Sequence, residues 1–243
     1  EQTLSSFVPN LIARRALADL KLPTTESLKS LDRQVTEGLA RIIDYQHDDG
    51  GWGWWKTDEN QPFMTAYAVY GLLEAQAAGY KVDRWTIQRG VRALRRLYAE
   101  YPRAIPELKV YSTYVILLAA AQGVGADNYA EGGKGWSQTA ALDELWSARS
   151  RMTAYGQSLL LLALDLVKDA RGNDLASELT AAAQRKGDLA WWTTDRDPLL
   201  EDFADTSVEA TAFAVRALAR RDPKNPLLEP AVRWLLLNRT YGV

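Results

Sequence analysis

The sequence contains no cysteine, a single histidine and no apolar run long enough to cross a membrane. Without cysteine, the chain can form no disulfide bond, no thiolate nucleophile and no thiolate metal site. The longest apolar runs, 114–121 and 159–167, are far shorter than the roughly 20 residues that a membrane-spanning helix needs. The 29 Lys and Arg residues nearly balance the 31 Asp and Glu residues, so the chain lacks the basic excess of a nucleic-acid-binding protein. We therefore expect no nucleic-acid partner, no membrane-spanning segment, no cofactor and no metal ion.

Helical periodicity dominates the chain, whose 47% hydrophobic and 25% charged residues are typical of a soluble globular protein. Apolar residues recur at helical spacing along almost the whole sequence, and we expect no strand. The expected helices are 4–20, 27–45, 62–78, 84–101, 109–122, 138–146, 152–169, 174–186, 205–220 and 227–238. Pro9 is expected to kink the first of them because it removes a backbone hydrogen bond. The apolar face of that helix consists of Leu4, Val8, Leu11, Ile12, Ala16 and Leu20.

Four of these helices repeat one pattern, in which an aromatic residue follows a small or hydroxyl residue and precedes an apolar run. The aligned aromatic residues are Tyr67, Tyr114, Tyr155 and Phe213. Their spacing of about 40 to 60 residues leaves room for one partner helix in each interval, which is the size of a helical-hairpin repeat. The repeated helices are apolar on all sides whereas their partners are amphipathic, so we expect an inner and an outer layer. An open solenoid and a closed α/α toroid both satisfy this pattern.

Two long loops rich in tryptophan favour the closed form. One begins with "QHDDGGWGWWKTDENQ" at Gln46, and the other is "QRKGDLAWWTTDRDPLLEDFADTS" from Gln184. Each loop connects an outer helix to an inner one, so we expect both at the same end of a ring. Trp54 and Trp192 are expected to emerge at that end.

The first of these loops has the composition of a tight turn. Asp48 and Asp49 are expected to cap or turn the backbone, because short acidic side chains bond to nearby backbone N–H groups. Trp52 is expected to tuck beneath the loop. Glycine tolerates positive φ, and we expect it at the three glycines of the loop. These are Gly50, Gly51 and Gly53.

Three segments of the sequence resemble one known domain. They are "EQTLSSFVPNLIARRAL" at the start, "YQHDDGGWGWWKTDENQPFMTAYAVYGLLEAQAAGY" from Tyr45, and "AVRWLLLNRTYG" near the end. In this order they resemble the thioester domain of bacterial alpha-2-macroglobulin proteins over nearly the whole chain. The resemblance implies an all-α fold, an α/α toroid built from two concentric rings of helical hairpins. We expect one such domain over residues 1–243, incomplete at both ends and part of a much larger multidomain protein.

In that family the domain opens with Cys-x-Glu-Gln, and the cysteine sulfur is joined to the glutamine side chain as an internal thioester. Glu1 and Gln2 match the last two residues of this motif. The resemblance therefore implies that Gln2 is the acyl partner of a cysteine two residues before Glu1. It also implies an inhibitor rather than an enzyme: a protease cuts a bait region elsewhere in the protein, the domain moves, and lysines of the protease are captured. The expected partners are target proteases and other domains of the parent protein, which is extracellular or periplasmic.

Two other functions remain open. Rings of α-helices often hold two carboxylates across one groove, so a toroidal glycoside hydrolase is an alternative. Its acid pair would be Asp48 or Asp49 on one side and Glu201 or Asp202 on the other. A non-reactive scaffold or binding domain is the third possibility, because many members of the family lack the cysteine.

Several conspicuous residues have a structural interpretation that we favour. His47 lies in a predicted turn and is expected to be a surface residue rather than a proton shuttle. The acids of the second loop are expected to form a solvated loop with helix caps rather than a catalytic set or a calcium site; they are Asp195, Asp197, Glu201, Asp202 and Asp205. Loop packing, rather than a ligand platform, is expected of the five loop tryptophans, which are Trp52, Trp54, Trp55, Trp191 and Trp192.

Overall fold

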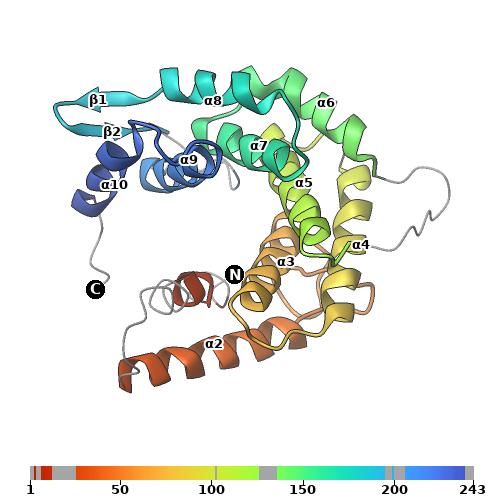
Figure 1. Cartoon of the computed structure of the whole chain (residues 1–243). Helices are drawn as coiled ribbons and strands as arrows, with labels where there is room; N and C mark the ends of the chain where they lie inside the picture. Colours follow the sequence, from red (N-terminus) through yellow and green to blue (C-terminus); the bar gives the residue numbers. More distant parts are fainter. Residues whose placement is uncertain are drawn as a thin grey trace. The chain divides into compact units, whose positions relative to one another are not determined.

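The computed structural model describes residues 3, 7–12, 26–101, 103–125, 136–194, 199 and 206–238, and helices dominate this part of the chain (Figure 1). Its elements are α2 (Glu26–Asp44), α3 (Pro62–Ala77), α4 (Arg84–Glu100), α5 (Pro106–Ala121), α6 (Gln138–Ala148), the 3-10 helix η1 (Arg149–Arg151), α7 (Ala154–Leu166), α8 (Gly172–Ala181), the strands β1 (Gln184–Lys186) and β2 (Leu189–Trp191), α9 (Ser207–Arg221) and α10 (Leu228–Leu237). The predicted helices from residue 27 onward are confirmed, with ends that differ by a few residues. No described helix is both long and apolar enough to cross a membrane.

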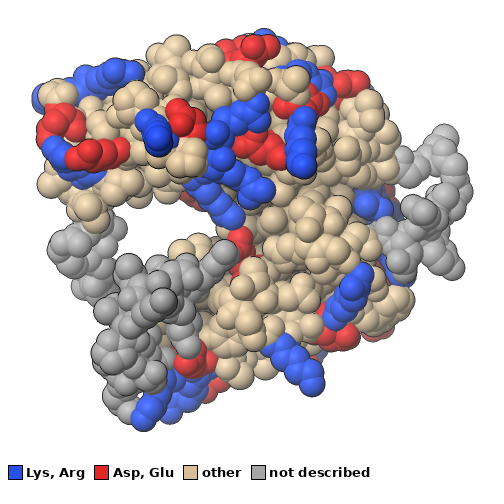
Figure 2. Space-filling view, in the orientation of Figure 1, with Lys and Arg blue, Asp and Glu red and all other residues tan. Residues whose placement is uncertain are grey.

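Two compact units make up the chain. The first contains residues 1–102 and 118–136, and the second contains residues 103–117 and 137–243. Over the face drawn in Figure 2, Lys and Arg side chains are interspersed with Asp and Glu side chains on the described surface. This face therefore carries no large patch of a single charge.

In the first unit, α3 forms the core and packs against both α2 and α4. Its residues are buried on almost every side of the helix, as the apolar sequence predicts, whereas α4 buries only one face. A Cβ atom at Gly90 of α4 would lie 2.6 Å from Val69 Cγ2 and 2.9 Å from Trp52 Cζ3. Glycine at this position therefore allows α4 to approach α3 and the Trp52 ring closely.

The described part of the N-terminal helix, residues 7–12, buries a face that differs in part from the predicted one. Val8 and Leu11 are buried as expected, but Ile12 is 49% exposed and Phe7 is 2% exposed. Phe7 packs on Gly38 of α2, where a Cβ atom would lie 2.8 Å from its ring. The space left by glycine thus turns Phe7 inward, and the prediction for Ile12 is wrong. The other predicted face residues lie outside the described residues.

In the second unit, α7 is the central helix and contacts α6, α8 and α9. Tyr155 of α7 and Phe213 of α9, two of the four aligned aromatic residues, meet edge to face with ring centroids 4.9 Å apart. Asp165, near the end of α7, has a side chain only 7% exposed and pairs with Arg221 at the end of α9 at 2.5 Å. The repeated aromatic position is therefore a real packing position in this unit. A common height for all four residues stays a prediction.

A β-hairpin interrupts the second unit where the sequence predicts helix. β1 pairs with β2 in antiparallel register, and Gly187 between them has a φ of +61°. The prediction of helix over 184–186 and of no strand in the chain is wrong here. Trp191 of β2 stacks on Trp234 of α10 at 5.9 Å between ring centroids, so a long-range contact stabilises the short strands.

Candidate functional site

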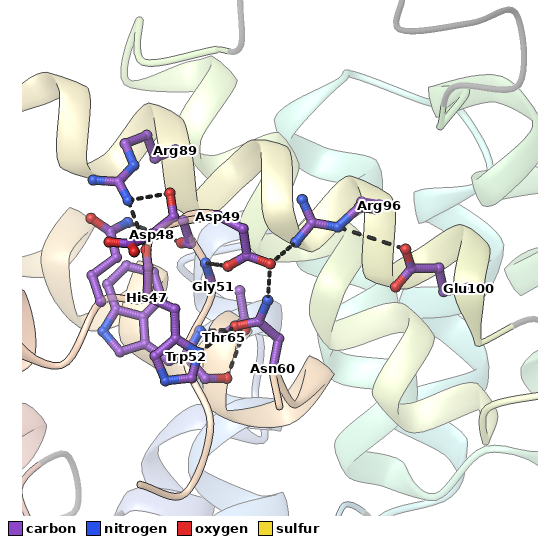
Figure 3. Close-up of polar contacts among 12 residues, drawn as sticks. His47, Asp48, Asp49, Gly51, Trp52, Asn60, Thr65, Arg89, Arg96 and Glu100 are labelled. Atoms are coloured by element: carbon purple, nitrogen blue, oxygen red, sulfur yellow. Dashed lines mark hydrogen bonds and ion pairs between the residues drawn. The ribbon is translucent and has the colours of Figure 1, made fainter. Parts of the chain in front are cut away.

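The loop between α2 and α3, residues 46–61, is the candidate site that the structure describes, and we call it the Trp52 loop (Figure 3). Glu1 and Gln2, the residues that match the thioester motif, lie outside the described residues, as do all five acids singled out in the second loop. The structure therefore describes the Trp52 loop of the first unit and not the two residues of the motif. The roles of Glu1 and Gln2 stay predictions.

The backbone of the Trp52 loop makes the predicted tight turn. The Gly50 N–H donates to the His47 carbonyl, and the His47 N–H donates to the Gly51 carbonyl, both at 2.9 Å. Asp49 Oδ1 accepts from the N–H of Gly51 at 3.3 Å, which is the turn expected of a short acidic side chain. Among the three loop glycines only Gly50 has positive φ, at +94°, so the prediction is wrong for Gly51 and Gly53.

Gly51 and Gly53 instead allow the two halves of the loop to pack closely against each other. A Cβ atom at Gly51 would lie 2.3 Å from Asn60 Oδ1, and one at Gly53 would lie 2.0 Å from Asp58 Oδ1. The returning half of the loop therefore presses directly on its first half. A side chain at either glycine would displace Asn60 or Asp58 from its hydrogen bonds.

Trp52 anchors the loop to the core of the first unit. It is 3% exposed, and its Nε1–H donates to the Ile42 carbonyl of α2 at 2.8 Å. The backbone N–H of Trp52 donates to Thr65 Oγ1 at 3.0 Å, and the Thr65 hydroxyl donates to the Trp52 carbonyl at 3.1 Å. The prediction that Trp52 tucks beneath the loop is confirmed. This role of Thr65 was not predicted from the sequence. The pattern that could have indicated it is the hydroxyl residue that recurs before the aligned aromatic residues.

Helix α4 fastens the outer side of the loop. Arg89 Nη2 donates to the carbonyls of His47 and Asp48 at 2.7 and 2.8 Å. Gln46 Nε2 donates to the carbonyl of Thr86 on the same helix at 3.0 Å. The loop is thus held between α2 and α3 by the buried Trp52, and on its outer side by these bonds to α4.

Asp49 is a structural anion in this arrangement. Its Oδ2 accepts from Asn60 Nδ2 at 2.5 Å and from Arg96 Nη2 at 2.6 Å. Partial burial by itself would raise the pKa of Asp49, but the hydrogen bonds from Asn60 and the Gly51 N–H, with the nearby Arg96, lower the pKa below its ordinary value. Arg96 also pairs with Glu100 at 3.6 Å.

The pKa of Asp49 does not fit one of the two roles in the glycoside-hydrolase alternative. The general acid in that reaction needs a raised pKa, whereas the pKa of Asp49 is lowered, which fits only the ionised nucleophile or base. Glu201 and Asp202, the proposed partners, lie outside the described residues. Within the part of the chain that the structure describes, no group of three or more His, Cys, Asp or Glu side chains is arranged to hold a metal ion.

His47 is not the surface residue that its turn position predicts. Its side chain is only 13% exposed. Nδ1 lies 2.9 Å from Asn60 Oδ1, and Nε2 lies 3.1 Å from the Trp55 carbonyl oxygen. The ring therefore connects the start of the Trp52 loop to its tip and to its returning half.

The tip of the loop carries two exposed tryptophans. Trp54 is 41% exposed and faces Phe63 with ring centroids 6.4 Å apart, whereas Trp55 is 73% exposed. Their backbone N–H groups donate to the two oxygens of Asp58, at 2.8 Å from Trp54 and 3.1 Å from Trp55. The expectation of loop packing is therefore wrong for Trp55.

A pocket of about 670 Å³ opens between the Trp52 loop and the end of α4. Its lining is mainly polar and includes more acids than bases. The charged residues that line it are Asp48, Asp49, Lys56, Asp58, Glu59, Arg96 and Glu100. Charged groups from the two elements thus face one another across the pocket.

The second unit contains a loop built in the same way, which we call the Trp192 loop (residues 182–206, described at 182–194, 199 and 206). Trp192 is 1% exposed, and its Nε1–H donates to the Leu179 carbonyl of α8 at 2.8 Å. Its backbone N–H donates to Thr211 Oγ1 of α9 at 3.1 Å. Loop packing is confirmed for Trp52, Trp191 and Trp192. Whether the two loops share one end of a ring stays a prediction.

Comparison with known proteins identifies the family. Residues 1–96 match the family model described as the A-macroglobulin TED domain. The chain is 35% identical to the alpha-2-macroglobulin of Thermotoga maritima over 108 residues, which are 44% of this chain and 6% of that protein. It is 30% identical to the alpha-2-macroglobulin of Escherichia coli K12 over 211 residues, which are 84% of this chain and 12% of that protein. The chain belongs to the alpha-2-macroglobulin family.

Solved structures of alpha-2-macroglobulins share the fold. A trypsin-activated protein from Escherichia coli superposes with a TM-score of 0.67 and 24% identity over 97% of this chain and 15% of that chain. A Salmonella alpha-2-macroglobulin reacted with methylamine gives the same TM-score and identity over 99% of this chain and 15% of that one. The predicted fold class, an all-α protein of the α/α-toroid type, is confirmed. The chain spans only a small part of the relatives it matches.

Proposed function

We propose that this chain is the thioester module of a protease inhibitor of the alpha-2-macroglobulin type, with Gln2 as the acyl donor. The observation that carries the proposal is the match of residues 1–96 to the TED-domain model, a range that includes the Glu1 and Gln2 pair. In the full-length protein, a cysteine two residues before Glu1 supplies the sulfur. Glu1 completes the motif and takes no bond in the reaction.

The chemistry follows from the acyl group. The cysteine sulfur adds to the side-chain carbonyl carbon of Gln2 and ammonia leaves, which stores a thioester. An amine then attacks the same carbon, the C–S bond breaks, an amide forms and the sulfur leaves as a thiol. Each molecule reacts once, so the protein is a stoichiometric inhibitor rather than an enzyme.

The partners and location follow from the family. One solved relative is described as trypsin-activated and another as reacted with methylamine. We propose the same response to proteases and amines for the full-length protein that contains this chain, with lysine amines of the protease as the captured groups. No histidine follows His47 in the chain, which supports direct capture of amines without an acyl-histidine intermediate. An extracellular or periplasmic location and contacts with other domains of the parent protein complete the proposal.

Covalent capture of trypsin by the full-length protein tests this function. The wild type is expected to form an adduct with trypsin that survives heating in detergent, and Gln2→Ala is expected to form none. Gln138→Ala is the matched control, because Gln138 is an exposed glutamine on α6 and its loss leaves the thioester intact. An adduct of normal yield in Gln2→Ala would contradict the proposal. Absence of the adduct in the wild type would favour the non-reactive scaffold instead.

A further inference from the structure

The His47 ring is held between two oxygen acceptors. Nδ1 lies 2.9 Å from the side-chain carbonyl oxygen of Asn60, and Nε2 lies 3.1 Å from the backbone carbonyl oxygen of Trp55. A carbonyl oxygen has no proton to donate, and a neutral imidazole carries a proton on only one of its two nitrogens. Only the doubly protonated ring donates to both oxygens at once.

The orientation of the Asn60 amide is fixed independently. Its Nδ2 donates to Asp49 Oδ2 at 2.5 Å. If the amide were reversed, its oxygen would face the Asp49 carboxylate, which Arg96 and the Gly51 N–H also contact as an anion. The amide oxygen therefore faces His47, and it is an acceptor there.

Charged groups from the loop and from α4 lie around the ring. Asp58 Oδ1 lies 3.8 Å from Nε2, and the Asp58 carboxylate also accepts from the backbone N–H groups of Trp54 and Trp55. The cation from α4, Arg89, donates to the backbone carbonyls of His47 and Asp48. The remaining charged neighbours on these elements line the pocket beside the ring; they are Asp48, Lys56, Glu59, Arg96 and Glu100.

We propose that His47 is a proton-operated latch that holds the tip of the Trp52 loop, residues 54–58, against the start of the loop. When the ring is protonated, it donates to Asn60 and to Trp55 together. When it loses a proton, one nitrogen presents a lone pair to a carbonyl oxygen, and that bond becomes a repulsion. Asn60 is fixed by Asp49, so the tip is the part that is released. The closed tip and the bound proton therefore stabilise each other, and the stabilisation is lost when the ring gives up its second proton.

Hydrogen exchange of the full-length protein tests the latch. The backbone N–H groups of Trp54 and Trp55 donate to Asp58, whose carboxylate lies 3.8 Å from His47 Nε2, so their protection reports the order that the ring gives to the tip. The measured protection is corrected for the intrinsic pH dependence of amide exchange. We expect protection of residues 54–58 to fall by about tenfold or more between acidic and alkaline pH, since a charge-assisted hydrogen bond is lost. A peptide that covers Trp192, which carries the same tryptophan frame without a histidine, is expected to show no such step.

The variant His47→Gln separates the latch from a general pH effect. Glutamine does not titrate, so protection of residues 54–58 is expected to be independent of pH in this variant while the Trp192 peptide stays protected. Retention of the pH step in His47→Gln would overturn the proposal. So would a wild-type tip whose protection is equal on both sides of the titration. These outcomes are independent of Gln2, because the latch involves only the Trp52 loop and its neighbours in the first unit.

Discussion

Trp52 and Trp192 occupy the same hydrogen-bonding frame in two different loops. Each donates its indole N–H to a backbone carbonyl of the preceding helix at 2.8 Å, to Ile42 in one loop and to Leu179 in the other. Each also donates its backbone N–H to a threonine hydroxyl of the following helix, at 3.0 and 3.1 Å. The two loops are therefore copies of one anchoring unit, in which a buried tryptophan joins an outer helix to an inner one.

The two threonine hydroxyls of this frame are predicted to contribute to the stability of the fold. In Thr65→Val the backbone N–H of Trp52 loses its acceptor in a buried position, which is expected to lower the free energy of unfolding by about 1–3 kcal/mol. Thr65→Ser keeps the hydroxyl and is the control. Urea unfolding measures both variants, and equal midpoints for Thr65→Val and the wild type would refute the role of this bond. Thr211→Val is expected to change the midpoint in the same direction.

Two tryptophans of the Trp52 loop differ in how far they are buried. Trp52 is 3% exposed and Trp55 is 73% exposed. Trp52→Ala is expected to cost about 3–5 kcal/mol of unfolding free energy because it removes a buried ring, whereas Trp55→Ala is expected to change it by less than about 0.5 kcal/mol. Thermal or urea unfolding compares the two. A large loss of stability in Trp55→Ala would show that this ring is packed against the protein rather than exposed.

Gly50 and Gly79 form a matched pair of glycines. Both have positive φ, +94° and +89°, but a Cβ atom at Gly50 would lie 2.6 Å from the Arg89 carbonyl oxygen, whereas one at Gly79 meets nothing within 4 Å. Gly79→Ala is therefore expected to cost about 1 kcal/mol from backbone strain alone, and Gly50→Ala distinctly more. Similar unfolding free energies for the two variants would show that the loop does not press on α4.

Asp49 is predicted to give the first unit an acid-sensitive contribution to stability. Its pKa is lowered in the folded chain, since hydrogen bonds from Asn60 and the Gly51 N–H, with Arg96, outweigh the effect of partial burial. A carboxyl group with a lowered folded pKa stabilises the fold above its unfolded pKa of about 4, and this stabilisation disappears as the pH falls through the folded pKa.

Asp49→Asn is therefore expected to be less stable than the wild type at neutral pH and to approach it in acid. Asp48→Asn removes the same charge from the neighbouring exposed position and is the control. The measurement is the unfolding free energy of both variants and the wild type from neutral to acidic pH. A deficit in Asp49→Asn that does not shrink in acid would count against the ionic role of Asp49.

The sequence predicts helices well and the hairpin poorly, for a physical reason. The segment "AAAQRKGD" continues a helical pattern, and nothing local in it specifies a strand. The hairpin is stabilised from outside, by the stacking of Trp191 on Trp234 and by the ion pair of Arg233 with Asp188. Phe7 shows the same limit, because the choice between Phe7 and Ile12 as the buried residue depends on the glycine of another helix.

In the candidate site, too, the local contacts were predictable from the sequence and the long-range contacts were not. The turn at Asp49 and the burial of Trp52 depend on residues near in sequence, and both were predictable. The bonds from Arg96 to Asp49 and from Arg89 to the loop join residues of two elements, so local pattern gives no sign of them. Gln2 stays a prediction, which rests on its match to the family motif and not on packing.

The most direct test of the thioester is the stoichiometry of methylamine and thiol in the full-length protein under native conditions. We predict one free thiol for each methylamine bound, a peptide in which Gln2 carries the methylamide, and unreacted protein that is lighter by one ammonia than its sequence requires. Neither change is predicted in Gln2→Ala. Native protein with a cysteine two residues before Glu1 that shows no lost ammonia and binds no methylamine at Gln2 would contradict the proposed function.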